Sequence, residues 1–166
     1  KDQVAIIMGI TQKLSSKYEI KAKYIALNLA LGHFPAVPFV QENKDAIHEM
    51  IELSSETPVI GKYVLSFFEA LMRKLWDGCS EANQGDKWYG FWIGPYLNAL
   101  KSEDDNLRTS VCTYITPIVV RINKMSLAVI LHEFLEDRQK NQSEVRVSQL
   151  EPLMTLLRVA RQNKMI

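Results

Sequence analysis

Apolar residues recur every three or four positions along most of the chain, which is the spacing of an α-helix with one buried face. The clearest stretch is 43–54, where Ile47 and Ile51 fall on one side and Glu49 falls largely on the other. No segment shows the strict alternation of apolar and polar residues that is typical of a half-buried strand. The pattern therefore predicts an all-α chain.

The ends of the predicted helices are marked by Gly, Pro and short polar segments. The predicted helices cover 2–14, 17–32, 43–54, 58–76, 87–100, 103–123, 125–138 and 144–163. Thr57 and Pro58 are predicted to start the fourth helix as N-cap and first helical residue, and the polar segment 77–87 is predicted to be the main loop. Kinks or breaks are expected at the prolines inside predicted helices, namely Pro95, Pro117 and Pro152.

The even-numbered predicted helices resemble one another in sequence. Segments 22–25 and 61–64 match in residue type at a separation of 39 positions. Aligning one apolar position in each of these helices gives steps of 39, 48 and 38, at Ile20, Val59, Leu107 and Val145. The long step contains the polar segment 77–87, as expected for an insertion between repeats.

Paired helices at a period of about 40 to 47 residues are typical of HEAT and armadillo arrays. An acidic, an apolar and a basic residue open the helices near 19–21, 105–108 and 144–146, whereas 58–60 departs from this pattern. On these residues the chain resembles the HEAT superfamily over nearly its whole length. The resemblance implies a right-handed α-solenoid of about four antiparallel helix pairs and about eight helices. It also implies a single domain over 1–166 with repeats near 1–34, 41–77, 87–123 and 125–163.

Composition narrows the possible partners and compartments. Twenty Lys plus Arg balance nineteen Asp plus Glu, so no strong overall field attracts nucleic acid or an anionic membrane. Charged residues, Gly or Pro interrupt every apolar run before the length of a membrane span. Cys79 and Cys112 are far apart, which favours a reducing, intracellular compartment, either cytoplasm or nucleus. Because the chain begins at Lys1 without Met, we expect a segment of a longer protein.

Motifs that bind cofactors or metals are not found in the sequence. There is no Gly-rich phosphate loop or dinucleotide fingerprint, and the three histidines do not have the spacing of zinc ligands. Cys112 is interpreted as a small core residue, whereas Cys79 falls in the polar segment, where a reactive thiol is conceivable. We therefore expect no cofactor, no metal and no enzymatic activity.

The implied solenoid favours a non-catalytic scaffold that binds another protein or a peptide segment. The candidate binding residues are four basic residues on the second helices and two tryptophans after the polar segment: Lys23, Lys62, Arg108, Arg146, Trp88 and Trp92. The basic residues could instead pair with acidic residues of the same chain, and the tryptophans could instead fill the core. Two other functions stay open at this point, an RNA- or DNA-binding helical scaffold and a small helical enzyme.

Overall fold

The computed structural model describes residues 17–141 and 147–164, which form helices joined by short turns, without a strand among these residues. The helices are α2 (Lys17–Ala30), α3 (Ala36–Glu42), α4 (Ala46–Leu53), α5 (Pro58–Glu81), α6 (Gly85–Leu100), α7 (Asp105–Ser110), α8 (Thr116–Ile122), α9 (Ser126–Asn141) and α10 (Val147–Gln162). A 3-10 turn, η1 (Leu31–His33), follows α2, and a π-helical turn, η2 (Val111–Ile115), joins α7 to α8 in one rod. With the α7–η2–α8 rod counted as one helix, the described residues form eight helices, and the predicted all-α class and number of about eight helices are confirmed for them. The helix predicted at 2–14 lies outside the described residues.

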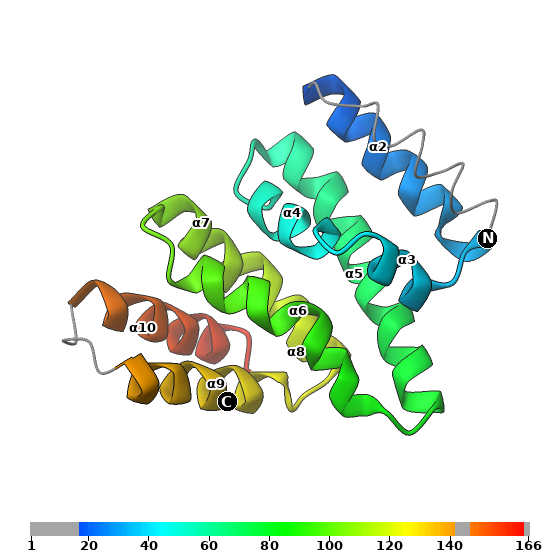
Figure 1. Cartoon of the computed structure of the whole chain (residues 1–166). Coiled ribbons are helices and arrows are strands. Elements are labelled where there is room, and N and C mark those ends of the chain that lie inside the picture. The colour runs from blue at the N-terminus through cyan, green and yellow to red at the C-terminus, as the bar shows by residue number, and fades with distance from the viewer. Residues whose placement is uncertain (1–16, 142–146, 165–166) are drawn as a thin grey trace.

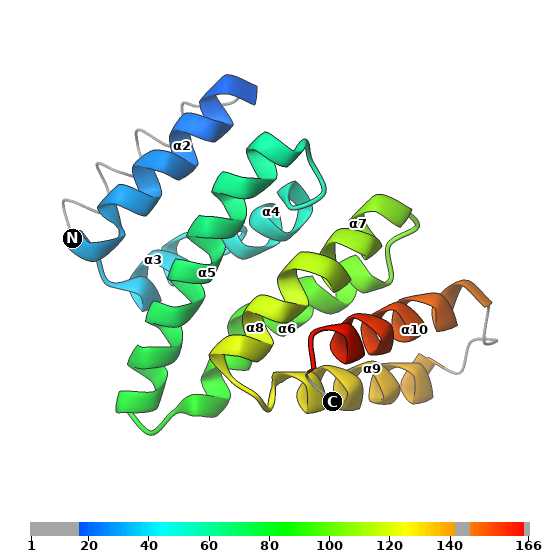
Figure 2. The same cartoon turned by 180° about the vertical axis from the view of Figure 1, so that it is seen from behind.

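The helices lie in two adjoining rows (Figures 1 and 2). One row holds α2, α5, the α7–η2–α8 rod and α10, and each of these packs against the next. The other row holds α4, α6 and α9, again in contact from one helix to the next. The two rows pack against each other. Helix α5 contacts α4 and α6, and α8 contacts α9. A helix in the middle, such as α5, is therefore covered from several sides.

The alignment of the second helices was wrong by one residue at α5. Val59 is 58% exposed, whereas Ile60 is 6% exposed and Leu107 of α7 is 8% exposed. Pro58 begins the helix, and Val59, its second residue, faces away from the core. With Ile60 in place of Val59, the buried side chains Tyr24, Leu27 and Leu31 correspond to Val64, Phe67 and Leu71 at a separation of 40 residues. Val145 lies outside the described residues.

Helix α3 was missed because its sequence, AVPFVQE, is short and follows a proline. Pro38 lies in the first turn, where a backbone N–H has no acceptor within the helix, and the first helical hydrogen bond runs from the N–H of Phe39 to the carbonyl of Pro35 at 3.3 Å. Phe39 is 4% exposed, and its ring centroid lies 4.8 Å from that of Phe34 and 6.2 Å from that of Phe67. The helix thus fixes an aromatic contact between the α2–α3 connection and α5.

The loop predicted at 77–87 was also wrong, because α5 continues to Glu81 and α6 begins at Gly85. Asn83 has a positive φ of 53°. The backbone N–H of Gln84 donates to the carbonyl of Cys79 at 2.7 Å, and that of Asn83 donates to Ser80 at 3.1 Å. This pair of bonds is a Schellman motif, in which asparagine adopts the left-handed conformation that ends a helix. The polar residues therefore form a tight helical corner.

The prolines have different effects on their helices. Pro58 occupies the first turn of α5 as predicted, but the side chain of Thr57 makes no capping hydrogen bond. Helices α6 and α10 continue through Pro95 and Pro152 without a break. Only Pro117 coincides with a change of helix type, because the π-helical turn η2 ends two residues before it.

Candidate functional site

Lys23 lies on α2 and ties this helix to α4. Its Nζ donates to Oε1 of Glu49 at 2.8 Å, and the hydroxyl of Tyr24 donates to the same oxygen at 2.8 Å. The Lys23 side chain is only 18% exposed. Burial, followed by the nearby Glu49 charge, raises the pKa of Tyr24 well above its usual range. The arrangement makes Lys23 an intramolecular tie between helices and not a free binding group.

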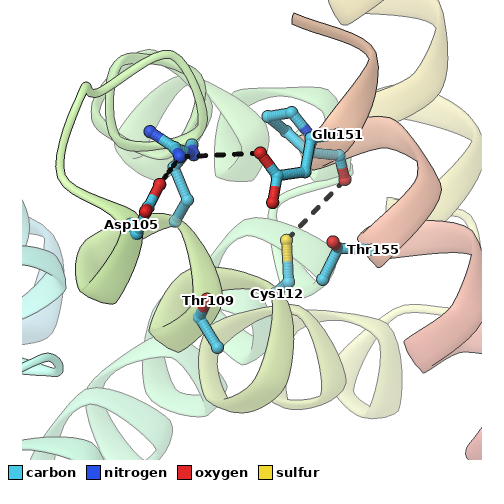
Figure 3. A pocket seen from close by; sticks show the side chains of 7 residues that line it. Asp105, Thr109, Cys112, Glu151 and Thr155 are labelled. Atoms are coloured by element: carbon cyan, nitrogen blue, oxygen red, sulfur yellow. Dashed lines mark hydrogen bonds and ion pairs between the residues drawn. The ribbon is translucent and has the colours of Figure 1, made fainter. Parts of the chain in front are cut away.

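Arg108 also pairs with acidic residues of the same chain, Asp105 and Glu151, which are labelled in Figure 3. Its guanidinium forms ion pairs with Asp105 on α7 and, at 3.8 Å, with Glu151 on α10. It also donates to the carbonyl of Ser102, and its side chain is 13% exposed. The hollow beside this cluster measures about 20 Å³, which is room for about one water molecule. This cluster joins α7 to α10, as the alternative of intramolecular pairing predicted.

The two tryptophans predicted as possible partner anchors are core residues. Trp88 and Trp92 are both 0% exposed, which excludes an anchoring role at the surface. Their ring centroids lie 5.4 Å apart, and Trp92 lies 5.6 Å from the ring of Tyr96 in an edge-to-face contact. The indole N–H of Trp88 donates to the carbonyl of Met72 on α5 at 3.0 Å. The aromatic cluster therefore packs α6 against α5.

The two cysteines are buried and unreactive in character. Cys79 is 5% exposed on α5, contrary to its predicted place in a loop, and burial raises the pKa of its thiol. Cys112 is 0% exposed, and burial raises the pKa of its thiol from 9.0 to about 12. Because the thiolate is the nucleophile, both environments oppose reaction near neutral pH.

Lys62 is the one predicted binding residue within the described chain that is exposed on a hollowed surface. It lies at the rim of an open groove of about 410 Å³ between α5 and α8, two neighbours in the same row (Figure 2). We call this the α5–α8 groove, and its lining residues are Lys62, Leu65, Ser66, Glu69, Thr113, Tyr114, Pro117, Ile118, Arg121 and Asn163. Arg146 lies outside the described residues.

The α5–α8 groove contains more cationic than anionic groups. Glu69 accepts from Arg73 at 3.0 Å and from Arg121 at 3.3 Å, so two guanidinium groups share one carboxylate. Partial burial acts to raise the pKa of Glu69, but the hydrogen bonds and charges of Arg73 and Arg121 outweigh it, and the pKa is lowered. Lys62 forms no ion pair with any described residue. The groove therefore carries surplus positive charge.

Tyr114 places an aromatic ring in this groove, and sequence reasoning missed it. The side chain is 50% exposed and belongs to the π-helical turn η2. Pro117 lacks a backbone N–H, and the buried hydroxyl of Thr116 donates to the carbonyl of Val111 at 3.0 Å within this turn. π-Helical turns are rare and frequently occur at functional sites. An aromatic residue on the solvent side of the predicted helix, just before a proline, was the available signal.

A second hollow, of about 490 Å³, lies between α4 and the start of α7. The carboxylates in its lining are Asp45, Glu49, Glu52, Glu56 and Asp104. Glu49, which was predicted on the polar side of the helix at 43–54, is already paired with Lys23, and this pairing lowers the charge available to a ligand.

Comparison with known proteins found no match, whether to a family model, to a curated protein or to a solved structure. Within the described ranges, no cluster of three or more His, Cys, Asp or Glu side chains has the arrangement to hold a metal ion. No helix in this part of the chain combines the length and apolar character required to cross a membrane.

Proposed function

We propose that the chain is a HEAT-type helical-repeat scaffold that binds another protein through the row of second helices. In this proposal α2, α5, the α7–η2–α8 rod and α10 are the second helices of four repeats in a right-handed solenoid. The stacking of neighbouring helices in two rows supports it, because repeat proteins bury their apolar faces between adjacent units. The recurrence of buried positions 40 residues apart in α2–η1 and α5 also supports it.

The observation that carries the binding function is the α5–α8 groove with the half-exposed ring of Tyr114. Tyrosine is enriched among the residues that dominate binding energy, because its rigid ring buries a large area and its hydroxyl can form a hydrogen bond. Lys62 and Arg121 line the same groove, and their charges could fix the orientation of a partner. An open groove suits a macromolecular surface better than a small substrate, which needs a more enclosed pocket.

Affinity capture from cell extract tests this function, with the chain and its Tyr114→Ala variant as parallel baits. We expect proteins captured by the native chain to be depleted at least about tenfold on the variant, since loss of a hot-spot side chain costs about 2 kcal/mol or more. Lys87→Glu is the control, because Lys87 is exposed at the start of α6 in the other row. Arg108 is unsuitable as a probe, since its replacement would disturb the α7–α10 contact.

A nuclease-treated extract separates protein binding from nucleic-acid binding. Retention of the captured proteins after nuclease treatment, together with their loss on Tyr114→Ala, would support the proposal. Capture that requires intact RNA would replace it with the nucleic-acid-binding scaffold. Capture that does not depend on Tyr114 would remove the groove as the binding surface.

A further inference from the structure

The charges and apolar groups of the α5–α8 groove define what a partner must present. Positive charge comes from Lys62, which has no acidic partner in the described chain, and from Arg121, which shares Glu69 with Arg73. A partner that brings carboxylates to the groove would therefore gain attraction without first breaking a one-to-one ion pair. A basic partner would meet uncompensated like charge.

The groove lining mixes polar residues with the apolar residues Leu65, Tyr114, Pro117 and Ile118. Pro117 and Ile118 are buried, so the apolar surface open to a partner comes from the half-exposed ring of Tyr114 and the partly buried Leu65. Ser66, which receives a hydrogen bond from Asn28 of α2 at 3.1 Å, is held on the α5 wall. An apolar side chain of a partner would find a preformed surface here, at little cost in ordering the groove.

We propose, resting on the protein-binding function above, that the α5–α8 groove binds an acidic peptide segment. An apolar side chain of the segment packs against Tyr114, and flanking Asp or Glu carboxylates pair with Lys62 and Arg121. A nucleic acid could also stack a base on Tyr114, but tight backbone binding requires several neutralised phosphates. The groove offers few uncompensated cations and places the ionised Glu69 among them. A carboxylate segment is therefore the better electrostatic match.

A displayed library of random peptides of about 12 residues, selected on the full chain, tests the proposal directly. We expect the selected peptides to be enriched in Asp and Glu next to a Leu, Phe or Ile. Dissociation constants for one labelled selected peptide are then measured on the native chain, Lys62→Glu, Tyr114→Ala and the control Lys87→Glu. We expect Lys62→Glu and Tyr114→Ala each to weaken binding about tenfold or more, and Lys87→Glu to change it less than about twofold. Circular dichroism of each variant checks that the helices are intact.

The possible outcomes separate this inference from the proposed function. Acidic peptides whose affinity falls with Lys62→Glu and with added salt support the inference. Selected peptides that are basic or neutral, or that bind all variants equally, overturn it while leaving Tyr114-dependent protein capture intact. Tighter binding of a single-stranded oligonucleotide than of any selected peptide, with loss on Lys62→Glu, overturns it in favour of a nucleic-acid groove. Failure to select any peptide overturns it as well, and the capture experiment then decides the broader function on its own.

Discussion

At the scale of single residues, identical side chains have different roles because their positions relative to the core differ. Lys62 lies at the groove without an ion pair to any residue that the structure describes, whereas Lys23 is paired with Glu49. Lys74 on α5 is different again, because its Nζ donates to the carbonyls of Leu31 and Phe34 at 2.5 Å each. These carbonyls lie where α2 and η1 end, so Lys74 completes the hydrogen bonding of a neighbouring helix terminus.

Replacing Lys74 by Met should lower the free energy of unfolding by about 1–3 kcal/mol, because the partly buried carbonyls of Leu31 and Phe34 lose a charged donor. Urea denaturation followed by circular dichroism measures this change. The adjacent Arg73→Met is the matched control. Its ion pair with Glu69 joins side chains that are 51% and 31% exposed, so we expect a loss of less than about 1 kcal/mol. Equal losses for the two variants would contradict the capping role of Lys74.

Cys112 should make the protein less stable as pH rises. In the unfolded chain the thiol has its ordinary pKa of 9.0, whereas burial raises the pKa to about 12 in the folded chain. Between these values the unfolded state releases a proton that the folded state keeps, so the free energy of unfolding falls with increasing pH. Below the lower value both states are protonated and this contribution is flat.

From about pH 8 to about pH 10, Cys112 alone should account for a loss of about 1.4 kcal/mol. Urea denaturation of Cys112→Ala at the two pH values should show a fall smaller by this amount than that of the native chain. Cys79, whose thiol pKa burial also raises, is left unchanged in both proteins. Identical pH dependence in the two proteins would show that Cys112 ionises normally in the folded state.

At the scale of helices, α7 has a side-chain cap that α5 lacks. The carboxylate of Asp104 accepts from the backbone N–H of Asn106 at 2.9 Å and of Leu107 at 3.4 Å. Asp104→Ala should therefore cost about 0.5–2 kcal/mol in the free energy of unfolding. Thr57→Ala, at the N-cap position of α5 without a capping bond, should cost less than about 0.5 kcal/mol. Thermal or urea unfolding of both variants would reveal a reversed order if the capping assignment were wrong.

Helices with a regular apolar stripe were predictable from sequence, and α4 lies within its predicted range. Part of what escaped prediction depends on a contact between distant segments, and part depends on local hydrogen bonds. Helix α3 exists because Phe39 packs against Phe67, which is far away in sequence. The corner at Asn83 looked like a loop because Gly, Ser and Asn are common both in loops and in helix termini. The π-helical turn depends on where Thr116 finds its acceptor.

The candidate site was predictable only in part. Lys62 was found from its place on a second helix, but the same reasoning selected Lys23 and Arg108, which pair within the chain. The partner of Lys23 is Glu49 on another helix, which local spacing does not reveal. Arg108 also pairs with Asp105, three residues earlier on the same helix, and this pair can be read from spacing. Trp88 was ambiguous because an apolar stripe does not reveal whether a neighbour covers it.

At the scale of the whole molecule, stability should be unevenly distributed along the rows. Helix α5 contacts helices of both rows, whereas α10 packs chiefly against α7 and the π-helical turn. Hydrogen exchange should therefore be slowest in the buried centre of α5 and in α6, and faster in α10. Exchange monitored by mass spectrometry under native conditions measures this order. Uniform protection from α2 to α10 would instead indicate a single cooperative unit.

The three tryptophans of the chain, Trp76, Trp88 and Trp92, form one continuous ring cluster where α5 meets α6. Tryptophan fluorescence, excited at a wavelength that tyrosine does not absorb, therefore reports only on this central contact, and its red shift marks the moment when water reaches the indoles. Unravelling of α2 or α10 leaves the emission unchanged but lowers the helical ellipticity. A denaturation in which ellipticity falls before emission shifts would show the terminal helices detaching first, without any added label.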